Sequence, residues 1–157
     1  MMIETPSKLD EIDRKILDAL SLNARMPVAE LARQVSLSKT PVQARLKRLE
    51  ESGVIRGYRA QLDPVRLGRD HVAFVEVKLS DTRERALTAF NSAALAVPEI
   101  EECHMIAGAF DYLLKVRTGD ITRYRHVLGE RISSLPHVAH TATHVAMQAV
   151  KDSGFVT

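Results

Sequence analysis

The chain has 157 residues, of which 45% are hydrophobic and 27% are charged, and its formal net charge at pH 7 is +2. These proportions are typical of a folded soluble protein and exclude a disordered one. No apolar run approaches the roughly 18 residues that a membrane-spanning helix needs, so we expect no membrane partner. The single cysteine, Cys103, cannot form an internal disulfide, which fits the reducing environment of the cytoplasm.

Positive charge is concentrated in the first half of the chain. Residues 1–66 contain 12 Lys and Arg against 9 Asp and Glu, whereas residues 67–157 contain 10 against 11. Within the first half, residues 33–59 hold seven basic side chains and only two acidic ones. This asymmetry indicates a polyanionic partner for the first half and a different task for the second.

Hydrophobic spacing in the first half predicts three helices. Asp10 can cap the first, and the second follows Pro27, which suits a first-turn position. After a three-residue break, Ser38 is a good N-cap for a third helix that stops at Gly53. Pro41 is compatible with this helix because it falls in the first turn, where backbone N–H groups have no helical partner.

The third helix has an apolar side and a polar, basic side. Val42, Leu46 and Leu49 cluster on the first, while Thr40 and Lys47 point the opposite way. A DNA-binding helix-turn-helix needs both sides, one to hold the helix and one to face bases and phosphates. The alternative is a three-helix bundle with a solvated basic face. The predicted DNA contacts are, at base edges, Ser38, Thr40, Gln43 and Arg45 and, at phosphates, Lys39, Lys47 and Arg48.

The segment Val54–Leu62 reads as strand-turn-strand, with its turn at Gly57. It is either a wing that touches phosphate or a linker strand. An isolated hairpin of this length is marginal alone, so we expect it to pair with the same strand of a second chain. The predicted domains are residues 1–53, a helix-turn-helix, residues 54–68, a linker hairpin, and residues 69–157, an effector-binding and oligomerisation domain.

The second half predicts the element order βαββαβ. Strands are expected over residues 71–80, 100–106, 110–116 and 138–150, with helices over residues 81–97 and from Asp120. This order is the ferredoxin-like plan, an antiparallel sheet with two helices on one face. The open face of such a sheet needs cover, so we expect self-association.

The second half contains no pattern typical of catalysis or metal binding. Cys103 and His104 are adjacent on a strand and point to opposite faces, as do His137 and His140. His140 and His144 share a face but lie about 13 Å apart, too far for one zinc ion. The sequence has neither a phosphate-binding glycine loop nor a Gly-x-Ser-x-Gly motif. We therefore expect no enzyme, no metal site and no cofactor.

Four stretches, taken together, resemble the Lrp/AsnC (leucine-responsive regulatory protein, feast/famine) family in order and spacing. They are LDEIDRKILDAL, ARMPVAELARQVSLSKTPVQARLKRLEESGVIRGYRAQLDP, VPEIEECHMIAGAFDYLLKVR and YRHVLGERISSLPHV. The resemblance implies an α+β protein with an N-terminal winged helix-turn-helix and a C-terminal ACT-like, amino-acid-binding domain. It also implies that linker strands join two chains and that dimers pair through open sheets into tetramers, octamers or higher assemblies.

In such proteins the effector lies between dimers, near a Gly-x-x-Asp-Tyr loop that here begins at Gly108. The effector positions that the resemblance implies are Met105, Gly108, Asp111, Ile121, His144, Val145 and Ala146. We expect Asp111 to hold the α-ammonium group of an amino acid and backbone N–H groups around Gly108 to receive its carboxylate. The apolar positions favour a mid-sized aliphatic side chain, as in leucine, valine or proline.

The sequence therefore predicts a cytoplasmic, nucleoid-associated regulator of transcription that binds double-stranded DNA as a homo-oligomer. Its DNA binding or assembly is expected to respond to a small metabolite, with an amino acid as the first candidate. Two alternatives stay open. One is a nucleoid-organising protein without an effector, and the other is a metabolite-sensor subunit that does not bind DNA.

Overall fold

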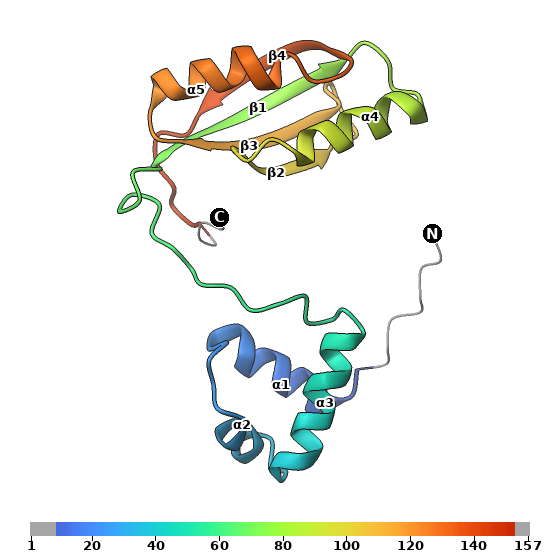
Figure 1. Cartoon of the computed structure of the whole chain (residues 1–157), viewed down its shortest axis with the longest axis vertical. Coiled ribbons are helices and arrows are strands. Elements are labelled where there is room, and N and C mark those ends of the chain that lie inside the picture. Colours follow the sequence, from blue (N-terminus) through green and yellow to red (C-terminus); the bar gives the residue numbers. More distant parts are fainter. Residues whose placement is uncertain (1–8, 153–157) are drawn as a thin grey trace. The chain divides into compact units, whose positions relative to one another are not determined.

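In a computed structural model of the protein, residues 9–152 are described, and the chain forms two compact units (Figure 1). The helical unit ends at Ala60, and the sheet unit begins at Gln61. No helix among residues 9–152 is long and apolar enough to span a bilayer.

The helical unit contains the three helices that the hydrophobic spacing predicts. They are α1 (Glu11–Leu22), α2 (Val28–Gln34) and α3 (Lys39–Glu51). α1 begins with a reciprocal capping box, in which Asp10 and Asp13 each accept the other's backbone N–H. Ser38 is the N-cap residue of α3, but its side chain makes no capping hydrogen bond.

One apolar core holds the three helices together. Each helix contributes at least one fully buried side chain, including Ile16 of α1, Leu31 of α2 and both Val42 and Leu49 of α3. Complete burial of such a side chain stabilises the fold by about 1.5–3 kcal/mol. The core therefore fixes which side of α3 faces inward and which side faces solvent.

The expected linker hairpin is wrong for the single chain. Residues 54–61 form no strand, and Leu62 makes only an isolated bridge. The segment is instead tied to α3, because the Tyr58 hydroxyl donates to Glu50 Oε1 over 2.9 Å. A two-stranded ribbon of this length is marginal in water, which explains why it does not form within one chain. Pairing with a second chain stays a prediction.

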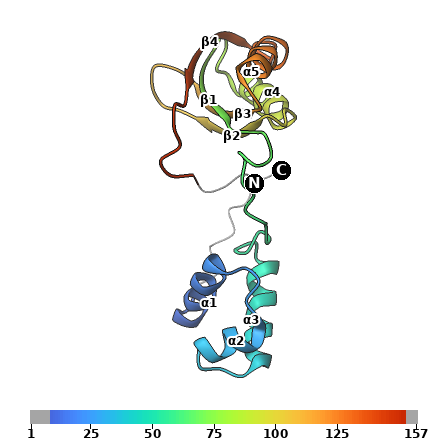
Figure 2. The same ribbon diagram turned by 90° about the vertical axis from the view of Figure 1, so that its left-hand side faces the viewer.

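The sheet unit confirms the predicted βαββαβ order. Its elements are β1 (His71–Leu79), α4 (Glu84–Leu95), β2 (Ile100–Met105), β3 (Tyr112–Thr118), α5 (Ile121–Val127), the π-helical turn η1 (Leu128–Ile132) and β4 (Val138–Val145). The strands pair antiparallel in the order β2-β3-β1-β4. Figure 2 shows α4 and α5 on the same side of this sheet.

The core of the sheet unit lies between the sheet and its helices. Alternate side chains of β1, among them Val75 and Val77, pack with Leu114 of β3 and Phe90 of α4. β4 ends at Val145, so the expected extension of this strand to Val150 is wrong. Beyond it, the chain turns back over the open face of the sheet and lines a cavity of about 680 Å³.

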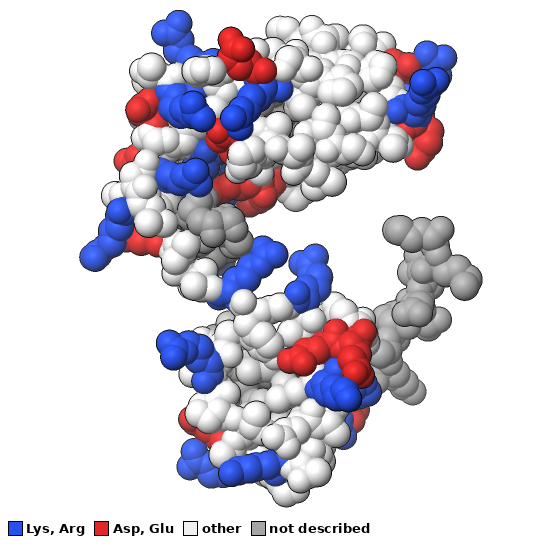
Figure 3. Space-filling model, in the orientation of Figure 1, with Lys and Arg blue, Asp and Glu red and all other residues white. Residues whose placement is uncertain are grey.

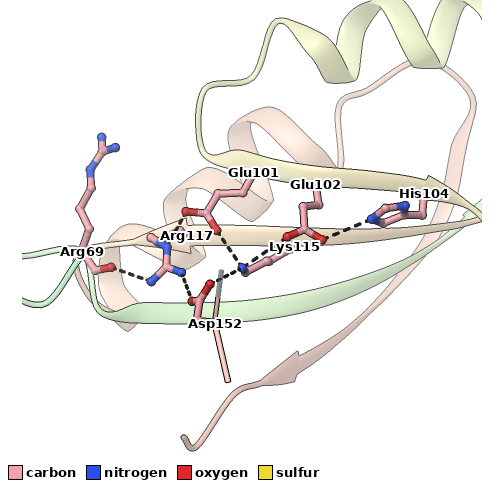
Figure 4. A network of polar contacts seen from close by, with 7 residues as sticks. All are labelled: Arg69, Glu101, Glu102, His104, Lys115, Arg117 and Asp152. Carbon is pink, nitrogen blue, oxygen red and sulfur yellow. Dashed lines mark hydrogen bonds and ion pairs between the residues drawn. The ribbon is translucent and has the colours of Figure 1, made fainter. Parts of the chain in front are cut away.

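Charged side chains occupy the open face where the chain returns (Figure 4). Arg117 of β3 is buried there and Lys115 is partly buried, with 3% and 13% of their side chains exposed. Both pair with Glu101 and with Asp152 of the returning segment. Burial alone lowers the pKa of Lys115, but the carboxylates of Glu101, Asp152 and Glu102 outweigh it and raise that pKa. This end of the sheet is therefore covered by residues 146–152.

Candidate DNA-binding surface and effector site

The outward side of α3 exposes most of the predicted DNA-contact residues. The exposed residues are Ser38, Lys39, Thr40, Gln43 and Lys47, together with Arg48. The Lys47 ammonium has a 3.7 Å contact with Glu51 one turn later. In Figure 3 the visible face of the helical unit carries separate groups of Lys and Arg, some of them with acids beside them. The outward side of α3 therefore offers hydroxyl, amide and ammonium groups, which are the groups that read bases and bind phosphates.

Arg45 and Arg48 differ from the other predicted contacts because both are paired within the helical unit. Arg45 Nη1 lies 2.6 Å from Asp10 Oδ2 and 2.7 Å from Asp13 Oδ1. Arg48 Nη2 donates to both carboxylate oxygens of Asp13, over 2.6 and 2.7 Å. The Asp13 side chain is only 1% exposed. These contacts hold α3 against α1 and favour a structural role for both arginines.

Ionisation of Asp13 is governed by two opposing effects. Burial raises the pKa of a carboxyl group, whereas hydrogen bonds from Arg48 and Arg45 lower it. The hydrogen bonds prevail, so the pKa of Asp13 lies below its ordinary value. Hydrogen bonds to Asp10 and Asp13 in turn raise the pKa of Arg45. Asp13 and Arg45 are therefore both charged at neutral pH.

Sequence reasoning did not identify Asp13. The signal was present, since Asp13 falls on the apolar side of α1 beside Ile12 and Ile16. An acid on an apolar stripe needs a partner when it is buried. Two arginines three residues apart on α3 lie on one face of that helix and can supply it.

Three predicted effector residues lie around the loop between β2 and β3. Met105 is 56% exposed at the end of β2 and borders a cavity of about 420 Å³. Asp111 Oδ2 accepts the backbone N–H of Leu79 over 2.7 Å, and its Oδ1 lies 3.4 Å from Lys78 Nζ. Asp111 is therefore part of the loop's structure, and Oδ1 is the oxygen with the weaker contact.

The same loop presents backbone donors. Within residues 9–152, the backbone N–H groups of residues 107–110, which include Gly108, donate no hydrogen bond. The loop is closed on both sides of them, where Ile106 N donates to Asp111 O and Asp111 N donates to Val77 O. Free N–H groups beside a small residue can receive a carboxylate.

The other predicted effector residues lie elsewhere in the sheet unit. Ile121 begins α5 just beyond the opposite end of β3 and is 49% exposed. His144, Val145 and Ala146 lie at the end of β4 and just after it, and His144 Nε2 is 3.2 Å from Glu76 Oε1. The β1–β3 register places the two ends of β3 six residues apart, or about 20 Å. One chain thus does not bring Asp111 and Ile121 together.

Within the described residues, the histidines and Cys103 do not gather into a group typical of a metal site. No group of three or more His, Cys, Asp or Glu side chains in the described part of the chain could hold a metal ion. His140 and His144 pair with Lys78 and Phe74 of β1 and point to the open face of the sheet.

Comparison with known proteins assigns each of the two units to a known domain family. Residues 72–156 match the Lrp/AsnC ligand binding domain, and residues 9–56 match a winged helix-turn-helix DNA-binding domain. A proline dehydrogenase transcriptional activator of Rhizobium radiobacter is 64% identical over 146 residues, which cover 93% of this chain and 94% of that one.

Solved structures agree over nearly the whole length. An AsnC family transcriptional regulator from Agrobacterium tumefaciens has a TM-score of 0.86 at 32% identity, over 95% of this chain and 97% of that one. A transcriptional regulator from Neisseria meningitidis in complex with L-Met has a TM-score of 0.85 at 29% identity, with the same coverage. The chain therefore belongs to the Lrp/AsnC family, whose members are DNA-binding transcriptional regulators with a ligand-binding domain and not enzymes.

Proposed function

We propose that the protein binds double-stranded DNA through the exposed side of α3, and that proline changes this binding or the assembly of the chain. Membership of the family makes the chain a transcriptional regulator with a domain that binds a small metabolite. The Rhizobium radiobacter relative is named for activating proline dehydrogenase, which supports proline over leucine and valine and the gene for that enzyme as a target. The Neisseria meningitidis neighbour in complex with L-Met supports an amino acid as the class of effector.

The observation that carries the DNA-binding proposal is the division of α3 into two sides. Val42 and Leu49 are completely buried, so the helix cannot rotate without loss of its core. Thr40, Gln43 and Lys47 are exposed on the other side. A major groove admits a helix that presents such a side, with its N-terminal part at the base edges. A protein that binds DNA in this way would act at the nucleoid.

Lys47→Ala tests this docking. We expect the variant to bind every duplex more weakly and to lower the slope of log affinity against log salt by about one unit, because one phosphate contact is lost. Fluorescence anisotropy titrations at several salt concentrations measure that slope.

Lys15→Ala is the matched control for this test. Lys15 is an exposed lysine of α1 that pairs with Glu11 one turn away, as Lys47 pairs with Glu51. It should leave the slope unchanged. If Lys47→Ala keeps both the affinity and the slope of the original protein while staying folded, the docking through this side of α3 is wrong.

The effector site is proposed to form between chains. Asp111, Gly108 and Met105 would come from one chain, and Ile121 with the end of β4 would come from another, because about 20 Å separates Asp111 from Ile121 within one chain. Asp111 Oδ1 would accept from the effector's ammonium group, and the free N–H groups of residues 107–110 would receive its carboxylate. Assembly beyond one chain is thus part of the proposal.

The linker is proposed to join two chains by pairing with its copy. Val54 and Tyr58 are 39% and 49% exposed in the single chain, and such pairing would bury both. We expect Val54→Asp to reduce the mass of the assembly in light scattering, because it places a charge in that contact. Leu22→Asp is the control, since Leu22 is 89% exposed at the end of α1. An unchanged mass for Val54→Asp would remove the linker from the interface.

A further inference from the structure

The pairing of Arg45 and Arg48 changes what α3 presents to DNA. Four acid-to-arginine contacts of 2.6 to 2.7 Å link these two cations to Asp10 and Asp13 of α1. Two positive charges therefore meet two negative charges, and the pairing is balanced. Lys39 and Lys47 are the cations of α3 that no residue of α1 neutralises.

Asp13 is the centre of this arrangement. Its carboxylate accepts from both arginines and from the backbone N–H of Asp10, so both oxygens are used. It is buried, whereas the Arg45 and Arg48 side chains are 25% and 46% exposed. The arginines thus lie at the boundary between α1 and solvent, where loss of Asp13 would release Arg48 and leave Arg45 with Asp10 as its remaining partner.

We propose that Asp13 is a positioning residue that determines specificity, because it withholds Arg45 and Arg48 from DNA phosphates. Contacts between cations and phosphates supply affinity that is independent of sequence. A helix with fewer such contacts depends more on its base contacts and discriminates better between sequences. Asp13 also fixes the tilt of α3 on α1, since it binds two arginines one turn apart. The inference rests on the proposed function, because it requires α3 to be the helix that meets DNA.

Asp13→Asn in the full chain tests the inference, with Asp18→Asn as its matched control. Asp18 is an exposed acid of α1 that makes no ion pair with residues 9–152, so its change alters the net charge equally but frees no arginine. Affinity is measured over a range of salt for a random-sequence duplex and for a duplex that the protein selects from a random library.

For Asp13→Asn we expect a salt slope on the random duplex that is steeper by about one to two units, since each added phosphate contact contributes about 0.9. The ratio of affinities for the selected and the random duplex should fall several-fold. Asp18→Asn should change neither quantity. A merely structural role for Asp13 would weaken binding to both duplexes without a steeper slope. If folded Asp13→Asn and Asp18→Asn have equal slopes, the inference is overturned.

Arg48→Gln provides a second test if Asp13→Asn does not fold. It leaves Asp13 paired with Arg45. We expect the salt slope to stay unchanged, in contrast to Lys47→Ala. A slope that falls by about one unit would show that Arg48 contacts a phosphate, which would overturn the inference. If the original protein binds neither duplex at low salt, the proposed function itself fails, and this is seen before any variant is compared.

Discussion

Asp111→Asn is expected to weaken effector binding by about ten- to a hundredfold. A hydrogen bond to a charged group contributes roughly 1.5–3 kcal/mol, and the variant loses the charge that attracts the effector's ammonium group. The asparagine Oδ1 can still accept the backbone N–H of Leu79, which Asp111 accepts over 2.7 Å, so the loop should keep its structure. Calorimetry with L-proline measures the loss, and DNA affinity without effector should barely change.

Asp81→Asn is the matched control for that measurement. Asp81 follows β1 and also accepts a backbone N–H, that of Arg83, over 3.0 Å. Hydrogen bonds from the Arg83 side chain and backbone hold its pKa at about 2, so it is charged at neutral pH. The control should bind the effector normally. Normal binding by Asp111→Asn as well would leave Asp111 only its structural role in the loop.

Asp13→Ala is expected to lower the free energy of unfolding of the helical unit by about 2 kcal/mol. Removal of one partner from a buried ion pair commonly costs 3–5 kcal/mol. The loss here is smaller because water can reach the released Arg45 and Arg48, which are 25% and 46% exposed. Urea denaturation followed by circular dichroism measures the change, and Asp18→Ala should have little effect. Equal stability of the two variants would contradict a stabilising role for the ion pairs of Asp13 with Arg45 and Arg48.

The difference in the free energy of unfolding between the original protein and Asp13→Ala is expected to depend on pH. The pKa of Asp13 is lowered in the folded state, so its carboxylate stabilises the fold above the pKa of the unfolded chain. That contribution is lost as the pH falls through the folded-state pKa, below the ordinary value of 3.8. The stability difference between the original protein and Asp13→Ala should therefore be constant from pH 7 to about pH 5 and shrink below about pH 4.

Local signals explain which parts of the fold could be predicted from the sequence. The Asp10 cap acts on α1 alone, and Pro41 with the spacing of Val42 and Leu49 acts on α3 alone. The structure has both helices where the pattern predicts them. The linker hairpin and the end of β4 depend on what lies beside them. The linker lacks a partner strand, and the chain leaves the sheet after Val145.

The candidate site divides in the same way. Exposure of Thr40, Gln43 and Lys47 follows from helix periodicity alone. The pairing of Arg45 and Arg48 with Asp13 is a tertiary contact across more than 30 residues, so helix periodicity alone did not separate them from the side chains predicted to face DNA. The placement of the predicted effector residues depends on more than local pattern, because Asp111 and Ile121 lie at opposite ends of β3 in a single chain. Their role in one site stays a prediction.

The most direct test of the central claim is a DNA-binding isotherm recorded with and without L-proline. The duplex is one that the protein selects from a random library, and the salt concentration is fixed. We predict that L-proline changes the apparent affinity or the cooperativity by about fivefold or more, in the range of ordinary coupling between two sites. If neither L-proline nor any of the other amino acids changes the isotherm that is recorded without effector, the protein is not an amino-acid-responsive regulator.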